Sequence, residues 1–266
     1  MQTENRKHNA GRPWTVPFMA AIMASVLASA LPAAGTPAAA SGRWSLDLEG
    51  GPVFSGYNDV QIPNPGGTRF SLSRDFHIPS RLYVRGRLSW KIASRHTLSA
   101  LYAPLTFKAS GKAAGPITFF GQTFPAGSDV AGTYTFNSYR LTYRYSWVEK
   151  ARLSLGVGFT AKIRDAVLGL RSGSLRAEKK NVGFVPLLNL LLHWRWSERF
   201  GLRLEADALA APQGRAEDVL LAVVWRASER LALRLGYRFV EGGADNEEVY
   251  TFAYIHYLAA GISLAW

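Results

Sequence analysis

The 266-residue sequence contains no cysteine, so it can form neither disulfide bonds nor thiolate metal sites. It also lacks long apolar runs: outside residues 14–31, no segment approaches the roughly 20 apolar residues that a membrane-spanning helix needs. The mean hydropathy of −0.03 excludes a bundle of membrane helices. That value suits either a soluble protein or a membrane β-barrel, in which only every second strand residue meets lipid.

Acidic residues are scarce relative to basic ones, with 19 Asp and Glu against 31 Lys and Arg, which gives a net charge of +12. A basic surplus often marks nucleic-acid binding. Here the basic residues stand singly in alternating segments, and no recognised nucleic-acid motif accompanies them. We therefore expect no nucleic-acid partner.

The first 40 residues have the order of a secretory signal peptide. A polar start with Arg6, Lys7 and Arg12 precedes the uncharged run WTVPFMAAIMASVLASAL at 14–31, and small, turn-prone residues follow. The alternative is a permanent anchor, which the short run and its Pro17 disfavour.

Small residues at Ala38 and Ala40 predict signal cleavage before Ser41, and Ala28 and Ala30 offer a second candidate position. The chain therefore divides into a signal peptide at 1–40 and one domain at 41–266.

Apolar and polar residues alternate with a period of two through most of the chain after residue 43, which is typical of strands with two different faces. In ARLSLGVGFTAKIR (151–164), the odd-numbered side chains from Leu153 to Ile163 share one face. The even-numbered side chains from Arg152 to Arg164 share the other. A helix, with a period of about 3.6, would scatter both sets around its axis.

About ten strands are expected, an even number that suits a single-chain bacterial barrel. The segments are 43–54, 82–92, 97–108, 139–147, 151–164, 184–196, 200–208, 217–226, 231–239 and 249–266. Eight or twelve strands remain possible, because 68–76 and 116–124 are either extra strands or strand extensions outside the membrane.

The connections alternate in length, as in outer-membrane barrels with short periplasmic turns and long outer loops. The short, polar links are 93–96, 148–151, 197–199 and 227–230. The longer links are 55–79, 109–131, 165–181 and 241–248, with 211–216 as a short exception. Both ends of the domain then lie on the periplasmic side.

Tryptophan distinguishes a membrane barrel from a soluble sandwich or lipocalin-like barrel, in which strands also alternate. Six tryptophans lie near the expected periplasmic ends of strands: Trp44, Trp90, Trp147, Trp194, Trp196 and Trp266. An aromatic girdle at the membrane interface explains this clustering, whereas a soluble core gives no reason for it.

The last ten residues, YLAAGISLAW, resemble the C-terminal signal of bacterial outer-membrane proteins, in which a terminal aromatic follows apolar residues at alternate positions. The matching residues are Leu258, Ala260, Ile262, Leu264 and Trp266. That family ends most often on Phe, so Trp is a small departure. The mature chain resembles a small Gram-negative barrel of the OmpA-transmembrane or OmpW-like kind. This resemblance implies an outer-membrane location and insertion by the barrel-assembly machinery.

The polar faces of the strands place many charges in the lumen. The basic candidates are Arg85, Arg87, Lys91, Arg140, Arg144, Lys162, Arg164, Arg195, Arg203, Arg226, Arg234 and Arg238. The acidic candidates are Asp47, Glu49, Glu205, Asp207 and Asp218. They predict either an internal ion-pair network that fills a narrow barrel or a basic, porin-like pore that favours anions.

These patterns predict a non-enzymatic barrel, either structural or a narrow passive channel. A lipid-modifying or proteolytic barrel, and a surface barrel for adhesion or lipopolysaccharide binding, are the alternatives. Catalysis needs a nucleophile beside a positioned base, and only His77, near Asp75 and Ser80, and the lumen residue His193 are candidates. The sequence shows no motif for catalysis, cofactor or metal, so we expect none. Outer-membrane lipid and lipopolysaccharide phosphates are the expected partners.

Overall fold

The computed structural model describes residues 42–266, so the expected signal peptide and its cleavage position lie outside the described residues. In this part of the chain, no helix has the length and apolar character needed to cross a membrane. The regular elements are β1 (Trp44–Gln61), β2 (Phe70–Ser71), β3 (Arg81–Ala93), β4 (His96–Ala103), β5 (Thr106–Lys112), β6 (Ile117–Phe119), β7 (Gln122–Phe124), β8 (Asp129–Glu149), β9 (Leu153–Ser172), β10 (Leu175–Arg195), β11 (Phe200–Ala211), β12 (Gly214–Arg226), β13 (Leu231–Asp245) and β14 (Tyr250–Ala265).

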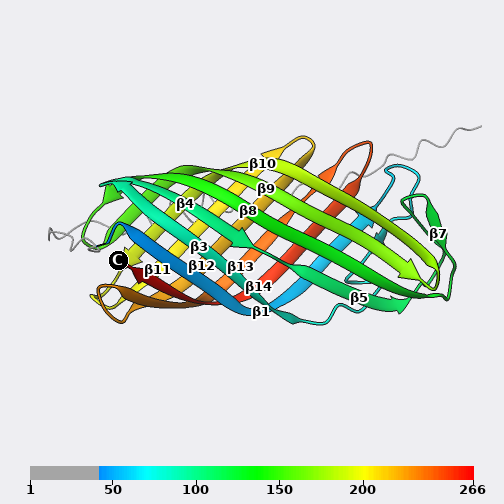
Figure 1. Ribbon diagram of the computed structural model, residues 1–266, viewed down its shortest axis with the longest axis horizontal. Helices are drawn as coiled ribbons and strands as arrows, with labels where there is room; N and C mark the ends of the chain where they lie inside the picture. The colour runs from blue at the N-terminus through cyan, green and yellow to red at the C-terminus, as the bar shows by residue number, and fades with distance from the viewer. Residues whose placement is uncertain (1–41) are drawn as a thin grey trace, which may run out of the picture. The chain divides into compact units, whose positions relative to one another are not determined.

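Ten antiparallel strands form a closed barrel. Figure 1 shows how they tilt around it. β4 and β5 are successive segments of one wall strand, because both pair with β8. β14 closes the barrel on β1, with pairs from Ser45↔Ala265 to Gln61↔Tyr250. β2 is a two-residue pairing beside β1, and β6 and β7 form a separate small sheet. The all-β barrel and the count of ten strands are confirmed.

Alternation along each wall strand separates an apolar outer face from a polar inner face. On β3, Leu82 is 76% exposed while its neighbour Tyr83 is buried, and on β13, Leu235 is 69% exposed while Arg234 is buried. Large apolar side chains therefore point outward and arginines inward, the reverse of a soluble barrel. This arrangement excludes the soluble sandwich and the lipocalin-like alternative.

The tryptophans lie at the strand ends next to the short turns and the C-terminus. The letter C marks this end of the barrel in Figure 1. Trp44 and Trp90 are cross-strand partners whose rings stack 5.5 Å apart. Every tryptophan in residues 42–266 lies in this girdle, which comprises Trp44, Trp90, Trp147, Trp194, Trp196, Trp225 and Trp266. Exposed indole rings in one ring of positions are typical of a membrane interface.

The expected long link at 165–181 is wrong. β9 and β10 run through it in continuous register, from Val182↔Asp165 to Leu175↔Ser172, and only Gly173 and Ser174 remain as the turn. Gly173 has a φ of 57°, a conformation that favours glycine in such a tight turn. The charged sequence of this segment resembled a loop, but it forms a hairpin that extends past the shorter β11–β12 hairpin.

Charged side chains pair along the surface of this β9–β10 extension. Glu178 accepts a hydrogen bond of 3.1 Å from Arg176 and lies 3.2 Å from the ammonium of Lys180. These two cations lower the pKa of Glu178 below its ordinary value, chiefly through their hydrogen bonds to the carboxylate. The extension therefore carries the ion pairs of a water-exposed hairpin.

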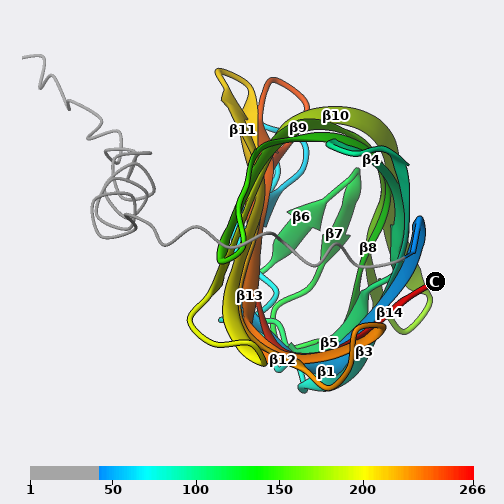
Figure 2. The same cartoon turned by 90° about the vertical axis from the view of Figure 1, so that its left-hand side faces the viewer.

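At the end of the barrel away from the tryptophans, two loops fold into the interior and cover this end from inside. The loop after β1 and the β6–β7 hairpin join through the amide of Phe120, which donates to the carbonyl of Ile62 over 2.9 Å. Seen from the tryptophan end, β6 and β7 lie across the interior (Figure 2). Apolar side chains of β6 and β7 pack with side chains of the neighbouring loop and wall in one buried cluster. It includes Phe70, Leu72, Phe76, Phe119, Phe124 and Leu170. We call this cluster the apolar plug.

Candidate functional site

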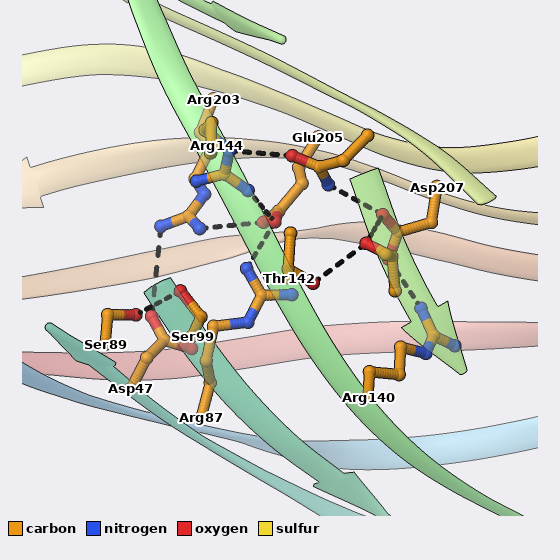
Figure 3. Close-up of polar contacts among 12 residues, drawn as sticks. Asp47, Arg87, Ser89, Ser99, Arg140, Thr142, Arg144, Arg203, Glu205 and Asp207 are labelled. Atoms are coloured by element: carbon orange, nitrogen blue, oxygen red, sulfur yellow. Dashed lines mark hydrogen bonds and ion pairs between the residues drawn. The ribbon is translucent and has the colours of Figure 1, made fainter. Parts of the chain in front are cut away.

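A network of charged side chains lies in the barrel interior, on the tryptophan side of the apolar plug. Figure 3 shows part of this network, in which side chains from several strands meet. Its members come from six strands that lie on different sides of the barrel. The network joins Arg85, Arg87, Arg140, Arg144, Arg203, Arg234 and Arg238 to Asp47, Glu49, Glu205, Asp207 and Asp218. We call it the ion-pair layer.

Glu205 on β11 is one centre of this layer. Its carboxylate accepts hydrogen bonds of 2.7 Å from Arg144 on β8 and from Arg203 on its own strand. Arg87 on β3 binds the same carboxylate from another side of the barrel. Because β3, β8 and β11 are not neighbours in the sheet, these contacts connect the walls through the lumen.

Asp218 on β12 is the second centre, and it also binds three guanidinium groups. Arg85 lies 2.9 Å away, Arg140 2.7 Å and Arg238 2.5 Å. Arg140 also reaches Asp207 over 2.8 Å, and this links β8 to both β11 and β12. Charge pairing of this density is expected where water is largely excluded, because a buried charge without a partner is costly.

Two carboxylates of β1 complete the layer at the point where the barrel closes. Glu49 accepts hydrogen bonds from Arg238 at 2.8 and 2.9 Å and from Arg234 at 3.0 Å, and Asp47 binds Arg234 and Ser263. Gly261 makes room for this contact, since a Cβ there would lie 2.4 Å from the guanidinium carbon of Arg234. The glycine-rich polar faces thus accommodate large arginines in a narrow interior.

Five basic residues expected in the lumen lie outside the layer. Arg195 donates to the carbonyl of Ala151 near the tryptophan girdle. Arg164 donates to Asn181, and Lys162 has neither an ion pair nor a hydrogen bond among the described residues. Two further basic candidates lie near the girdle: Lys91 pairs with Glu149 over 3.4 Å, and Arg226 is half-buried.

A cavity of about 370 Å³ lies inside the barrel toward its plugged end. Strands β8 to β14 contribute to its wall, together with the end of β1. Its apolar side chains include Ile62, Phe136, Leu168, Pro186, Leu209, Val240 and Ile255. Its charged side chains include Lys162, Arg164, Lys179, Arg215, Glu241 and Glu248. A largely apolar cavity with a few converging polar groups is typical of a ligand site.

The histidines make few polar contacts in the interior. His96 and His256 lie at the outer face, where each binds a tyrosine hydroxyl, at 2.7 Å for Tyr143 and 2.5 Å for Tyr237. His77 forms a backbone bridge to Ser110, and the carboxylate of the nearby Asp75 accepts a hydrogen bond from the amide of Ser71 instead.

The sequence interpretation missed the apolar plug and the apolar half of the cavity. A bulge between Ser55 and Tyr57 changes which residues of β1 face inward, from Val53 before it to Asn58 and Val60 after it. Two features of the sequence could have indicated this change of face, namely Gly56 at the bulge and the alternation that resumes at Val60.

Known proteins resemble this chain in fold rather than in sequence. No protein-family model and no curated protein matches the sequence. Among solved structures, the outer membrane protease OmpT from Escherichia coli matches with a TM-score of 0.55 at 10% identity, over 86% of this chain and 98% of that chain. The transport unit of the autotransporter AIDA-I from Escherichia coli matches with a TM-score of 0.45 at 8% identity, over 92% and 97% of the two chains.

The fold defines a class of protein: the chain is a bacterial outer-membrane β-barrel. The comparison with OmpT shows the fold, and the apolar outer face with its tryptophan girdle accounts for the membrane location. Within that class it is a ten-stranded barrel whose interior holds the ion-pair layer, the apolar plug and the cavity of about 370 Å³. We call this cavity the side cavity.

Proposed function

We propose that this protein is a non-enzymatic outer-membrane barrel whose lumen is closed to passive solute flow. The observation that carries the proposal is the ion-pair layer, in which the carboxylates of Glu205 and Asp218 each bind three arginines from different walls. A ten-stranded barrel leaves only modest room inside, and paired side chains occupy that room. Of the two expected versions, this favours the structural one over the anion-favouring channel.

Chloride efflux from lipid vesicles tests this closure. Vesicles that contain the folded wild-type barrel should lose chloride at the rate of protein-free vesicles, because the paired arginines are unavailable to a passing anion. A variant that removes one centre together with two of its partners, Glu205→Ser with Arg87→Ser and Arg144→Ser, should raise the rate severalfold. Rapid efflux through the wild-type barrel would contradict the proposal.

The absence of catalysis is part of the same proposal. It is supported by the surroundings of His77, because the carboxylate of Asp75 accepts its hydrogen bond from the amide of Ser71 and His77 forms a backbone bridge to Ser110. His77→Ala and His193→Ala should leave the lipid A pattern and outer-membrane proteolysis of producing cells unchanged. A changed pattern in either variant would favour the enzymatic alternative.

We also propose that the C-terminal residues act as the signal for the barrel-assembly machinery. Trp266 exchanges backbone hydrogen bonds with Trp44, of 3.0 and 3.1 Å, and its ring is exposed. Trp266→Ala keeps those backbone groups, so barrels refolded in detergent should be nearly as stable as wild type. The amount assembled in the outer membrane of cells should nevertheless fall severalfold, as measured on heat-modifiable gel bands. Equal amounts of the two proteins would oppose a role for Trp266 as a signal.

A further inference from the structure

The side cavity holds buried polar groups that the barrel itself does not pair. The Lys162 side chain is 3% exposed, and the structure gives its ammonium no hydrogen bond or ion pair among residues 42–266. Its neighbour is the ring of Phe136, whose centroid lies 4.7 Å away. Asn58, 1% exposed, also lines the cavity, and its Nδ2 has no partner. Both groups are donors, so they suit a ligand with an anionic acceptor.

The nearby charges leave a local excess of positive charge for such a ligand. Glu241, a carboxylate of the cavity wall, is bound by Arg215 at two distances of 2.8 Å and by Tyr57. Arg164 adds a second cation, which binds the amide of Asn181 rather than a carboxylate. An isolated buried ammonium is costly unless a counter-charge accompanies it.

The cavity reaches the outer surface through the wall between β10 and β11. Pairing between these strands ends at Leu188↔Ala208, although β10 continues to Leu175 with β9 as its only partner strand. Pro186 lies just past the last pair and has no N–H to donate.

Side chains on both edges of this gap line the cavity: Phe184, Val185 and Pro186 on β10, and Leu209 and Ala211 on β11. The cavity wall therefore includes inward-facing and outward-facing positions of the same strand. We call this gap the side opening.

The side opening lies where the outer leaflet meets water. Phe184 is ten positions from the girdle residue Trp194, a height of about 25 Å for a tilted strand, which matches the thickness of the apolar band. Phe184 is 61% exposed beside the opening. Above it, Lys179 of β10 bridges to Glu248 in the β13–β14 turn over 3.5 Å. The opening thus lies at the outer edge of the apolar band, below an ion pair that joins β10 to the β13–β14 turn.

We propose that the cavity binds a single-chain amphiphile with one carboxylate headgroup, a long-chain fatty acid in chemical class, which reaches it from the outer leaflet through the side opening. Lys162 and Asn58 bind the carboxylate. The chain lies against Phe136, Val240 and Ile255 and extends between β10 and β11 toward lipid. This site lies beyond the ion-pair layer and does not depend on whether the barrel conducts.

Binding of lauric acid to the full-length barrel in a neutral detergent tests the headgroup contact. Lys162→Met should weaken binding at least about tenfold, because it removes a charge-assisted hydrogen bond. The variant should fold as well as wild type, since Lys162 has no polar partner among residues 42–266 to lose. Lys91→Met, which removes a cation outside the cavity, is the matched control and should bind as wild type does.

Three results would overturn the assignment. They are no binding of lauric acid to wild type, equal binding by Lys162→Met, and tighter binding of lauryl alcohol or dodecyl phosphate than of lauric acid.

Photo-crosslinking with a lauric acid that carries a diazirine at its chain end tests the side opening. Peptide mass spectrometry should find the label on β10 near Phe184 to Pro186 and on β11 near Leu209 to Ala211. Label in the β6–β7 hairpin or at the tryptophan girdle would contradict this route, because it would place the chain end away from the opening.

Discussion

Glu205→Gln should lower the free energy of unfolding of the barrel by about 3 to 5 kcal/mol, the cost of breaking a buried ion pair from one side. The substitution preserves shape but removes the charge that binds Arg87, Arg144 and Arg203. Three guanidinium groups would then share an interior from which water is largely excluded. Their one remaining ion pair within residues 42–266 would join Arg203 to Asp47 at 3.9 Å. Urea titration of barrels refolded in lipid vesicles, followed by gel mobility, measures the change.

Asp129→Asn is the matched control for this prediction. Asp129 pairs with Lys112 at 3.1 Å, but its side chain is 84% exposed. A surface pair of this kind contributes about 1 kcal/mol or less, so the control should stay close to wild type. If Glu205→Gln were as mild as Asp129→Asn, the arginines would have water or other partners available, and the lumen would be hydrated rather than closed.

Leu141→Arg should destabilise the barrel in lipid by about 2 to 4 kcal/mol, the cost of an arginine on the lipid face near the bilayer midplane. Leu141 is exposed on the outer face of β8. It lies six positions from Trp147, a height of about 15 Å above the girdle for a tilted strand. The same urea titration in vesicles measures the loss.

Val182→Arg provides the comparison for Leu141→Arg. Val182 also points outward and is 70% exposed, but it lies in the β9–β10 extension, where Asp165 is its cross-strand partner. An arginine there meets water and a carboxylate, so the free energy of unfolding should change by less than about 1 kcal/mol. Equal losses at both positions would contradict the assignment of the outer face to lipid.

The strand pattern could be predicted because lipid and lumen make opposite demands on neighbouring residues. Leu82 and Leu235 face outward and are apolar, whereas Arg85 and Arg238 on the same strands face inward and are charged. That contrast is local in sequence, so it revealed the strands, the barrel and the inward orientation of the arginines. The partners of each arginine could not be predicted in this way, because they depend on contacts across the lumen.

The plugged end was harder to predict, because its residues break that local rule. Phe107, Phe119 and Phe124 are fully buried inside, although apolar residues elsewhere on the wall mark the lipid face. The β9–β10 extension was mistaken for a loop because of its many charged residues, although Leu168, Leu170 and Ala177 on its inner face pack into the apolar plug. The lack of a partner for Lys162 depends on which strands surround it, which the alternation alone does not determine.

Single-channel recording in planar lipid bilayers tests the central claim most directly, namely that paired side chains close the lumen. The folded wild-type barrel should give no stepwise conductance at neutral pH, because Glu205 and Asp218 bind arginines from opposite walls. Insertion is verified on the same preparation by heat-modifiable gel mobility. Reproducible, anion-selective conductance steps from the wild-type barrel would contradict the account.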